Sequence, residues 1–201
     1  MQTVLGLPSI EVESNAGIRE IPLPTHYLKT RKVFLLGEIN SESISHLVMQ
    51  LLFLESESCE AINLYINSPG GEVNAGLMLY DVLQGMQSPV NIYCMGMAAS
   101  MAAIILASGI KGRRYILPHS KVMIHEPLIN GGFGGSATSI KNISENILET
   151  KKLLNEILAK HTGKTVEEVD AATAFDHYMT AEEVIDFGIC DKIMTSLNGT
   201  D

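Results

Sequence analysis

The chain has 201 residues, a length typical of one domain and sufficient to bury a substantial core without disulfides. Hydrophobic residues make up 46% of the sequence and charged residues only 18%, which excludes a disordered chain and a highly charged surface binder. The formal net charge of -9 argues against a nucleic-acid partner, because phosphate binding needs clustered lysines and arginines.

The three cysteines are odd in number, widely spaced and set among apolar residues, so we expect buried thiols in a reducing cytoplasm: Cys59, Cys94 and Cys190. Their spacing predicts no metal site, and nothing in the sequence calls for a cofactor. The chain does not begin with the pattern of a secretory signal. Its most apolar stretch, residues 95–110, is too short to span a bilayer comfortably and is interpreted as core, with no membrane partner.

Residues 1–30 contain three prolines that prevent a long helix, and we expect an irregular arm or loop there. Beyond them, short apolar runs of strand length alternate with amphipathic helical patterns. The strands are predicted at 32–39, 61–68 and 90–96, and the helices at 41–54 and 73–86. In the first helix, one apolar face is formed by Ile44, Leu47, Val48, Leu51 and Leu52. This alternation indicates right-handed crossover units in a mainly parallel sheet, which is an α/β fold.

Further strands are predicted at 113–117 and 121–125, followed by a glycine-rich segment at 130–136. The longest helical pattern covers 138–161, and its length predicts that part of the helix projects beyond the core. Two capping boxes then indicate short helices near the C-terminus, at Thr165 with Glu168 and at Thr180 with Glu183.

Two strand-to-helix junctions carry residues suited to chemistry. Gly70-Gly71 lets the backbone turn sharply and leaves amide groups free to bind an oxyanion, although a tight turn alone would also need these glycines. Ser100 stands among small residues at the start of a predicted helix, where developing negative charge is stabilised. A serine there can equally be a helix cap, and the sequence is not the G-x-S-x-G elbow of the α/β-hydrolases.

His125 ends an apolar strand and suits a general base, because its ordinary pKa lies close to neutral pH. A structural histidine at the margin of a sheet is the competing interpretation, and five other histidines compete for the role: His26, His46, His119, His161 and His177. The segment 161–165 only imitates a phosphate-binding loop, because position 158 is leucine where that motif needs glycine. We therefore expect no ATP site there.

Three segments together resemble the proteolytic subunit of the caseinolytic (Clp) protease, in the family's order and spacing: INSPGG (66–71), GMAASM (96–101) and LPHSKVMIHEP (117–127). The resemblance extends from about Tyr27 to Ile193 and includes LAKHTG (158–163) and DHYMTAEE (176–183). It implies a crotonase-like α/β fold of the ClpP type, with repeated ββα and βαβ units and a projecting handle helix at about 138–161. The implied layout is an axial arm at 1–30, one serine-protease domain at 31–195 and a tail at 196–201.

The resemblance also implies the site. Ser100, His125 and Asp176 would form a catalytic triad, and the amides of Gly71 and Met101 an oxyanion hole. A substrate-binding strand would include Gly131, Gly132, Phe133 and Gly134. The triad order Ser, His, Asp matches none of the three orders familiar from other serine hydrolases, so this assignment follows from the resemblance alone.

The implied function is that of a serine endopeptidase that hydrolyses unfolded proteins to short peptides. Its partners would be further subunits in two stacked seven-membered rings, a tetradecamer of this chain or a hetero-oligomer with a paralogous subunit, and an AAA+ ATPase unfoldase. Two alternatives stay open: a non-catalytic or weakly active ring subunit that needs a paralogous partner, and an acyl-CoA-transforming enzyme on the same architecture.

The chain departs from the family's pattern at several positions. Met97 replaces a glutamine in the nucleophile motif, and Ala174-Phe175 replace an Asp-Arg pair that helps hold ring to ring. Asn63 stands where an aromatic residue commonly lines the docking pocket for the ATPase, and residues 15–19 replace a more charged arm. These departures lead us to expect weaker autonomous assembly.

Overall fold

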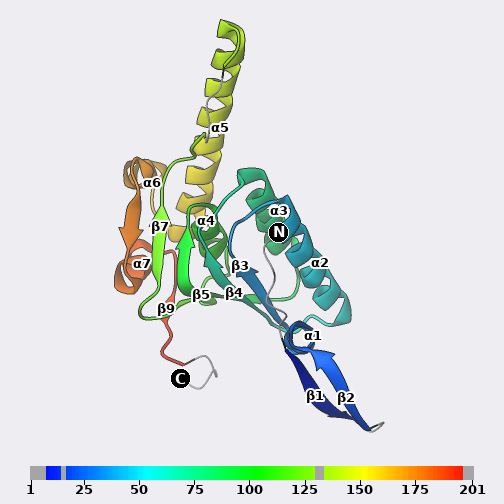
Figure 1. Cartoon of the computed structure of the whole chain (residues 1–201). Coiled ribbons are helices and arrows are strands. Elements are labelled where there is room, and N and C mark those ends of the chain that lie inside the picture. Colours follow the sequence, from blue (N-terminus) through cyan, green and yellow to red (C-terminus); the bar gives the residue numbers. More distant parts are fainter. Residues whose placement is uncertain (1–7, 15–16, 130–133, 197–201) are drawn as a thin grey trace.

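The computed structural model describes residues 8–14, 17–129 and 134–196. A seven-stranded sheet forms the centre of the described chain (Figure 1). Five strands lie in the order β3 (Lys32–Leu36), β4 (Ile62–Ser68), β5 (Val90–Ala99), β6 (Arg114–Ile116) and β9 (Lys192–Ile193), all parallel to their neighbours. In addition, β7 (Lys121–Ile124) pairs parallel with β5, and β8 (His177–Met179) pairs antiparallel with β7. The mostly parallel α/β sheet confirms the expected fold class.

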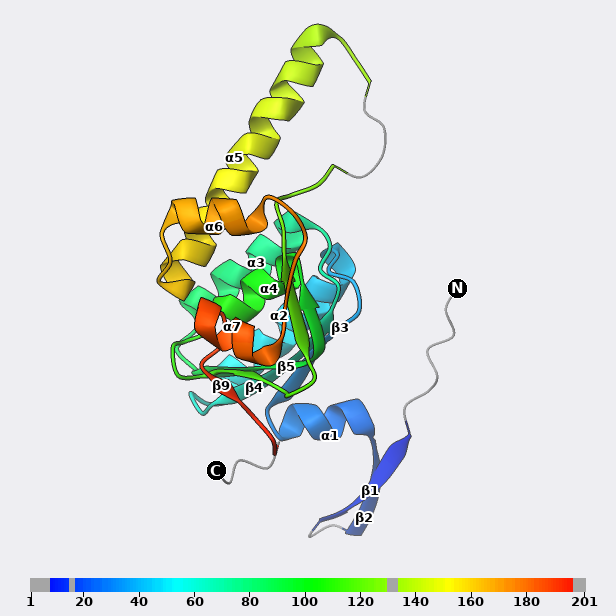
Figure 2. The same ribbon diagram turned by 90° about the vertical axis from the view of Figure 1, so that its left-hand side faces the viewer.

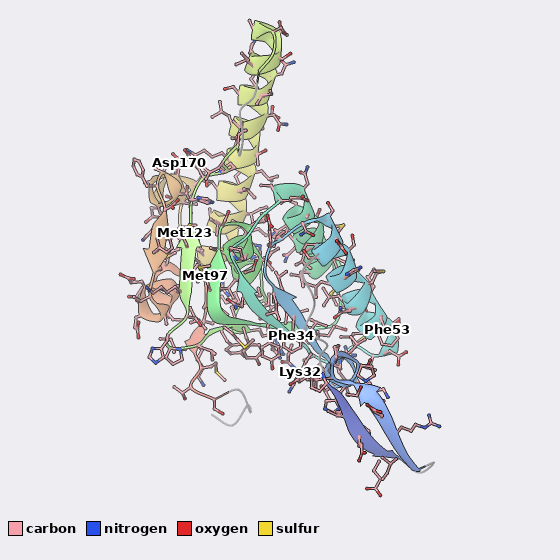
Figure 3. The ribbon with its side chains drawn as sticks, in the orientation of Figure 1. Lys32, Phe34, Phe53, Met97, Met123 and Asp170 are labelled. Carbon is pink, nitrogen blue, oxygen red and sulfur yellow. The ribbon has the colours of Figure 1, made fainter. Side chains whose placement is uncertain are left out.

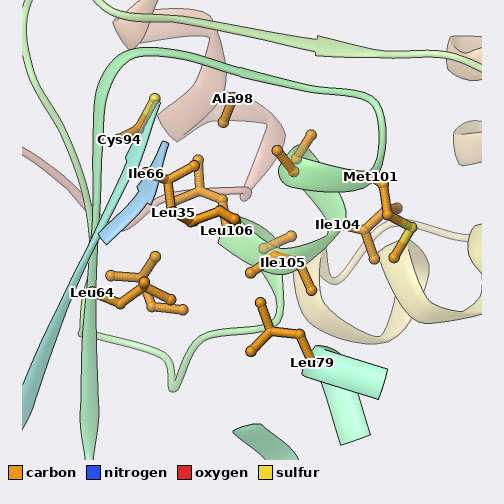
Figure 4. Packing of buried hydrophobic residues seen from close by; sticks show 14 of the residues in the cluster. Leu35, Leu64, Ile66, Leu79, Cys94, Ala98, Met101, Ile104, Ile105 and Leu106 are labelled. Atoms are coloured by element: carbon orange, nitrogen blue, oxygen red, sulfur yellow. The ribbon is translucent and has the colours of Figure 1, made fainter. Parts of the chain in front are cut away.

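Three helices connect the first strands and cover the apolar sheet: α2 (Ser41–Glu57), α3 (Val73–Gly85) and α4 (Met101–Ala107). Every residue of α4 is buried, and its side chains pack with Leu35 and Leu64 of the sheet and Leu79 of α3 in one hydrophobic cluster (Figure 4). The predicted apolar face of α2 is right at its centre but wrong at one edge, since Leu52 is 52% exposed. A helix that packs on one side buries an arc of its surface, and Leu52 lies outside that arc.

Strand β5 bends in the middle and, on the side away from β4, pairs with two different strands. Residues 92–94 pair with β6, whereas residues 97–99 pair with β7. Gly96 marks the change, with φ of 90°, a conformation that glycine adopts without steric cost. Figure 3 shows Met97 of β5 and Met123 of β7 on these neighbouring segments. The bend carries the end of β5 alongside β7, and the candidate site lies there.

The C-terminal part begins with α5 (Ala137–Thr162), whose 26 residues span about 39 Å at the usual rise per residue. Its buried residues lie only between Leu154 and Leu158, and the N-terminal half projects from the rest of the molecule (Figures 1 and 2). Helices α6 (Val166–Thr173) and α7 (Ala181–Phe187) follow, and both begin at the predicted capping boxes, which the hydrogen bonds of Thr165 and Thr180 complete.

The prediction of an irregular N-terminal arm is wrong. Strands β1 (Ser9–Ser14) and β2 (Gly17–Pro22) form an antiparallel hairpin, followed by helix α1 (Leu23–Lys29). Pro24 occupies the first turn of that helix, where the lack of an N–H group costs nothing. The hairpin projects from the opposite end of the molecule to α5 (Figure 2).

The cysteine prediction holds for two residues of three. Cys94 and Cys190 are buried, and burial raises the pKa of the Cys94 thiol to about 12. Cys59 is exposed, because it lies in the turn that follows the last residue of α2. Within the described ranges, no helix combines the length and apolar composition needed to cross a membrane, and no cluster of three or more potential metal ligands occurs.

Candidate active site

A cleft of about 530 Å³ opens where β4, β5 and β7 end, and both predicted junctions line it. Gly70 and Gly71 form one part of its wall, and Ser100 and Met101 form another, with His125 between the strands and α5. Much of the remaining wall is apolar: Val73, Ile104, Leu128, Leu154 and Leu158. Among the six histidines of the sequence, all of them in the described ranges, only His125 lines this cleft.

Ser100 occupies a strained turn between β5 and α4. Its φ of 54° and ψ of -123° place it outside the conformations that side-chain-bearing residues prefer, at a cost of about 1–3 kcal/mol. The surrounding packing holds this conformation, because α4 is fully buried and the Ser100 N–H donates to the Met123 carbonyl at 2.8 Å. The Ser100 side chain makes no capping hydrogen bond to α4. The turn therefore points the hydroxyl away from the helix and toward β7.

His125 contacts both other candidate residues. Its Nε2 lies 2.8 Å from Ser100 Oγ, and its Nδ1 lies 3.1 Å from Asp176 Oδ1. An ionised carboxylate can only accept, so the Nδ1–H donates to Asp176 and the Nε2 lone pair faces the serine hydroxyl. The His125 side chain is 15% exposed, whereas the Asp176 side chain is 58% exposed. The arrangement can remove a proton from Ser100 Oγ as that oxygen attacks an electrophile.

The pairing of β7 with β8 brings His125 and Asp176 together. Ile124 is opposite His177 in this antiparallel pair. One position further along, His125 therefore comes opposite Asp176. The two residues are 51 positions apart in the sequence, and the three-residue strand β8 brings them together by pairing with β7.

The two-glycine turn lies directly against Ser100 and Met101. A methyl group added to Gly70 would stand 2.8 Å from Ser100 Cβ and 3.1 Å from the Met101 nitrogen. A methyl group added to Gly71 would collide with the Ile39 carbonyl oxygen. The φ angle of Gly71, 149°, also favours glycine. The backbone of this turn can therefore lie against Ile39 on one side and Ser100 and Met101 on the other only because both residues lack side chains.

Other predicted positions lie elsewhere. Gly131, Gly132 and Phe133 lie outside the described residues, and Gly134 is exposed and not among the described residues that line the cleft. Asn63 lies on β4, where its Oδ1 accepts a hydrogen bond from Asn91 at 2.9 Å.

One polar group next to the site was missed by the sequence analysis. Lys151 of α5 lies between two carboxylates, 2.9 Å from Glu126 Oε2 and 2.9 Å from Asp170 Oδ1. The hydrogen bonds to Asp170 and Glu126 raise the pKa of Lys151. Asn155, one turn further along α5 and 4% exposed, donates to Asp170 at 3.0 Å. A buried asparagine four residues after a lysine on a partly apolar helix face was the available signal.

The fold and the cleft together define a class of protein: a mostly parallel α/β domain with serine, histidine and aspartate side chains in contact at the ends of its strands, the arrangement typical of serine hydrolases. Comparison with known protein families matches residues 17–197 to the Clp protease family. The chain belongs to this family, and it is a Clp-type protease subunit.

Proposed function

We propose that the chain is a serine endopeptidase subunit of a self-compartmentalised protease and cleaves unfolded polypeptides to short peptides. The observation that supports this most is the position of His125, within hydrogen-bond distance of Ser100 on one side and Asp176 on the other. A nucleophile, a base and a group that orients the base are the minimum needed for acyl transfer through a serine.

In the proposed mechanism, Ser100 Oγ attacks the carbonyl carbon of a peptide bond while His125 Nε2 takes its proton. Asp176 keeps the Nδ1–H directed toward its carboxylate and stabilises the imidazolium that forms. His125 then gives the proton to the leaving amine, and a water molecule hydrolyses the acyl-enzyme by the same steps. The amides of Gly71 and Met101 would stabilise the oxyanion of each tetrahedral intermediate.

Family membership implies oligomeric rings that work with an ATPase. We propose that a separate AAA+ unfoldase supplies the unfolded chains in the cytoplasm, and that this chain alone cleaves short peptides. The segment 130–136 would pair with the backbone of the substrate as an added strand, which gives binding that depends little on sequence.

The test is the turnover of a fluorogenic peptide by the assembled protein without ATP or coenzyme A. Replacement of Ser100 by alanine should lower turnover by about 10⁶-fold, because the nucleophile is lost. Ser45→Ala, at an exposed position in the second turn of α2, is the matched control and should leave turnover unchanged. Retained turnover in the Ser100→Ala protein would falsify the nucleophile, and activity only toward acyl-CoA thioesters would favour the acyl-CoA alternative.

A second candidate function is a weakly active ring subunit that needs a paralogous partner. The observation in its favour is Phe175, which is 86% exposed beside the candidate site where the family resemblance leads us to expect an arginine. An exposed phenyl ring cannot supply the directed hydrogen bonds of an Asp-Arg pair. Mixed particles that are more active than particles of this chain alone would favour this candidate.

A further inference from the structure

The contact between His125 and Asp176 lacks the packing that would normally fix it. The Asp176 side chain is 58% exposed, the preceding Phe175 extends into solvent, and the strand that follows has only three residues. The distance between imidazole and carboxylate nevertheless matters, because a displacement of about 1 Å at a reacting site can cost about 100-fold in rate. Contacts outside the cleft that support the short pairing of β7 with β8 would therefore help to hold together the two segments that carry His125 and Asp176.

Lys151 joins the two segments. Glu126, one of its partners, directly follows His125 in the sequence, and Asp170, the other, lies in α6, the helix that leads to Asp176. Close by, the Glu126 N–H donates to the Thr173 carbonyl at 2.8 Å, so the same two segments are also tied through their backbones. In the view of Figure 3, Asp170 lies above Met123 of β7, the strand that His125 follows in the sequence.

The charges in this group favour a cation between the two segments. Without an ammonium group between them, the carboxylates of Glu126 and Asp170 would repel each other across the gap between their segments. Asn155, itself buried, donates to the same Asp170 Oδ1 atom and so helps to hold this carboxylate in place. The hydrogen bonds from Lys151 to Asp170 and then to Glu126 raise the pKa of Lys151, so both carboxylates stabilise its charged form.

We propose that Lys151 is a positioning residue for the candidate triad: by bridging Glu126 and Asp170, it sets the separation between His125 and Asp176. It does not line the cleft. The inference rests on the proposed function, since it assigns to α5 a role in the activity of that same site. A partly exposed ion pair contributes only about 0–1 kcal/mol to stability, so the effect should appear in catalysis more than in folding.

The test compares three variants of the assembled protein on a fluorogenic peptide. Lys151→Met should lower kcat by about 10- to 100-fold and leave KM nearly unchanged, because substrate does not contact this residue. Lys151→Arg keeps the charge and should restore most of kcat. Lys152→Met is the matched control, because Lys152 is 76% exposed and pairs with Glu156 across 3.9 Å, and kcat should not change.

A double-variant measurement separates positioning from general damage. In an Asp176→Asn background, Lys151→Met should cause little further loss in the rate at which a fluorophosphonate labels Ser100, because the carboxylate that orients His125 is already absent. Native mass and unfolding midpoint are recorded for each variant. The inference is overturned if kcat of Lys151→Met stays within about two-fold of wild type. It is also overturned if Lys151→Met lowers the labelling rate as much in the Asp176→Asn background as in the wild type, or if kcat falls only when the assembled particle dissociates. A wild-type protein that neither cleaves peptide nor is labelled would instead reject the proposed function, and the inference with it.

Discussion

The two ends of the Ser100–His125–Asp176 arrangement are held in different ways. Ser100 lies between the buried end of β5, Ala98 and Ala99, and a helix in which every residue is buried, and this packing maintains a strained backbone conformation. Asp176 lies next to Phe175, which is 86% exposed, and its position depends on a short strand and on polar contacts. The position of the nucleophile is thus a property of the core, whereas that of the orienting carboxylate is sensitive to charge and to whatever covers that surface in an assembly.

Apart from loss of the nucleophile itself, the largest effect should come from Asp176→Asn, which tests the exposed end. An asparagine can direct its NH₂ group at Nδ1, which would favour the wrong tautomer of His125 and leave no lone pair at Nε2 for the serine proton. We expect kcat to fall by about 10⁴-fold, with the free energy of unfolding almost unchanged. Steady-state kinetics and urea denaturation measure the two quantities. Substantial unfolding in this variant would mean that the exposed end supports the fold, and the comparison would fail.

The next effect concerns the buried end. Leu106 of α4 is fully buried, and Leu106→Ala should lower the free energy of unfolding by about 2–5 kcal/mol through lost burial and the cavity left behind. Ile110, just beyond α4 and 54% exposed, provides the matched control, and Ile110→Ala should change stability by less than about 0.5 kcal/mol. Equal effects at the two positions, measured by denaturation, would contradict a nucleophile held by core packing.

The smallest effect is expected in assembly. Restoring the charged pair with Ala174→Asp and Phe175→Arg should strengthen ring association by about ten-fold. Charge-assisted hydrogen bonds contribute about 1.5–3 kcal/mol each, and the loss of the apolar contacts of Phe175 offsets part of this gain. Native mass spectrometry and peptide turnover across a dilution series measure this. If the unaltered chain already forms a fully active particle at nanomolar concentration, Phe175 must pack well against its neighbour and the expectation of weak assembly is wrong.

The sequence predicted the interior of the fold well because burial leaves a periodic pattern. The apolar runs at 61–68 and 90–96 became β4 and the first part of β5, and the long amphipathic pattern became α5. The arm was mispredicted because its prolines were interpreted as breakers, although the alternation of Ile10 and Val12 with charged and polar residues is a strand signal. Leu52 and Cys59 were assigned to the interior from local composition, which does not reveal the edge of a buried face.

For the site, the sequence identified residue types at junctions but not their geometry. Ser100 and the two glycines could be singled out because strand-to-helix turns impose recognisable requirements. The pairing of His125 with Asp176 was expected from the family resemblance alone, because the contact follows from the register of a three-residue strand that has no periodic signal. Lys151 was missed for a similar reason: its two partners come from different segments, and only the folded chain brings their charges together.

The most direct measurement of the central claim is the reaction of the intact assembled protein with a fluorophosphonate, followed by peptide mapping. We predict one adduct per subunit, located on Ser100, absent in Ser100→Ala and formed far more slowly in Asp176→Asn. A native-mass-verified particle that gains no adduct, or gains it on another serine at the wild-type rate, would contradict the account.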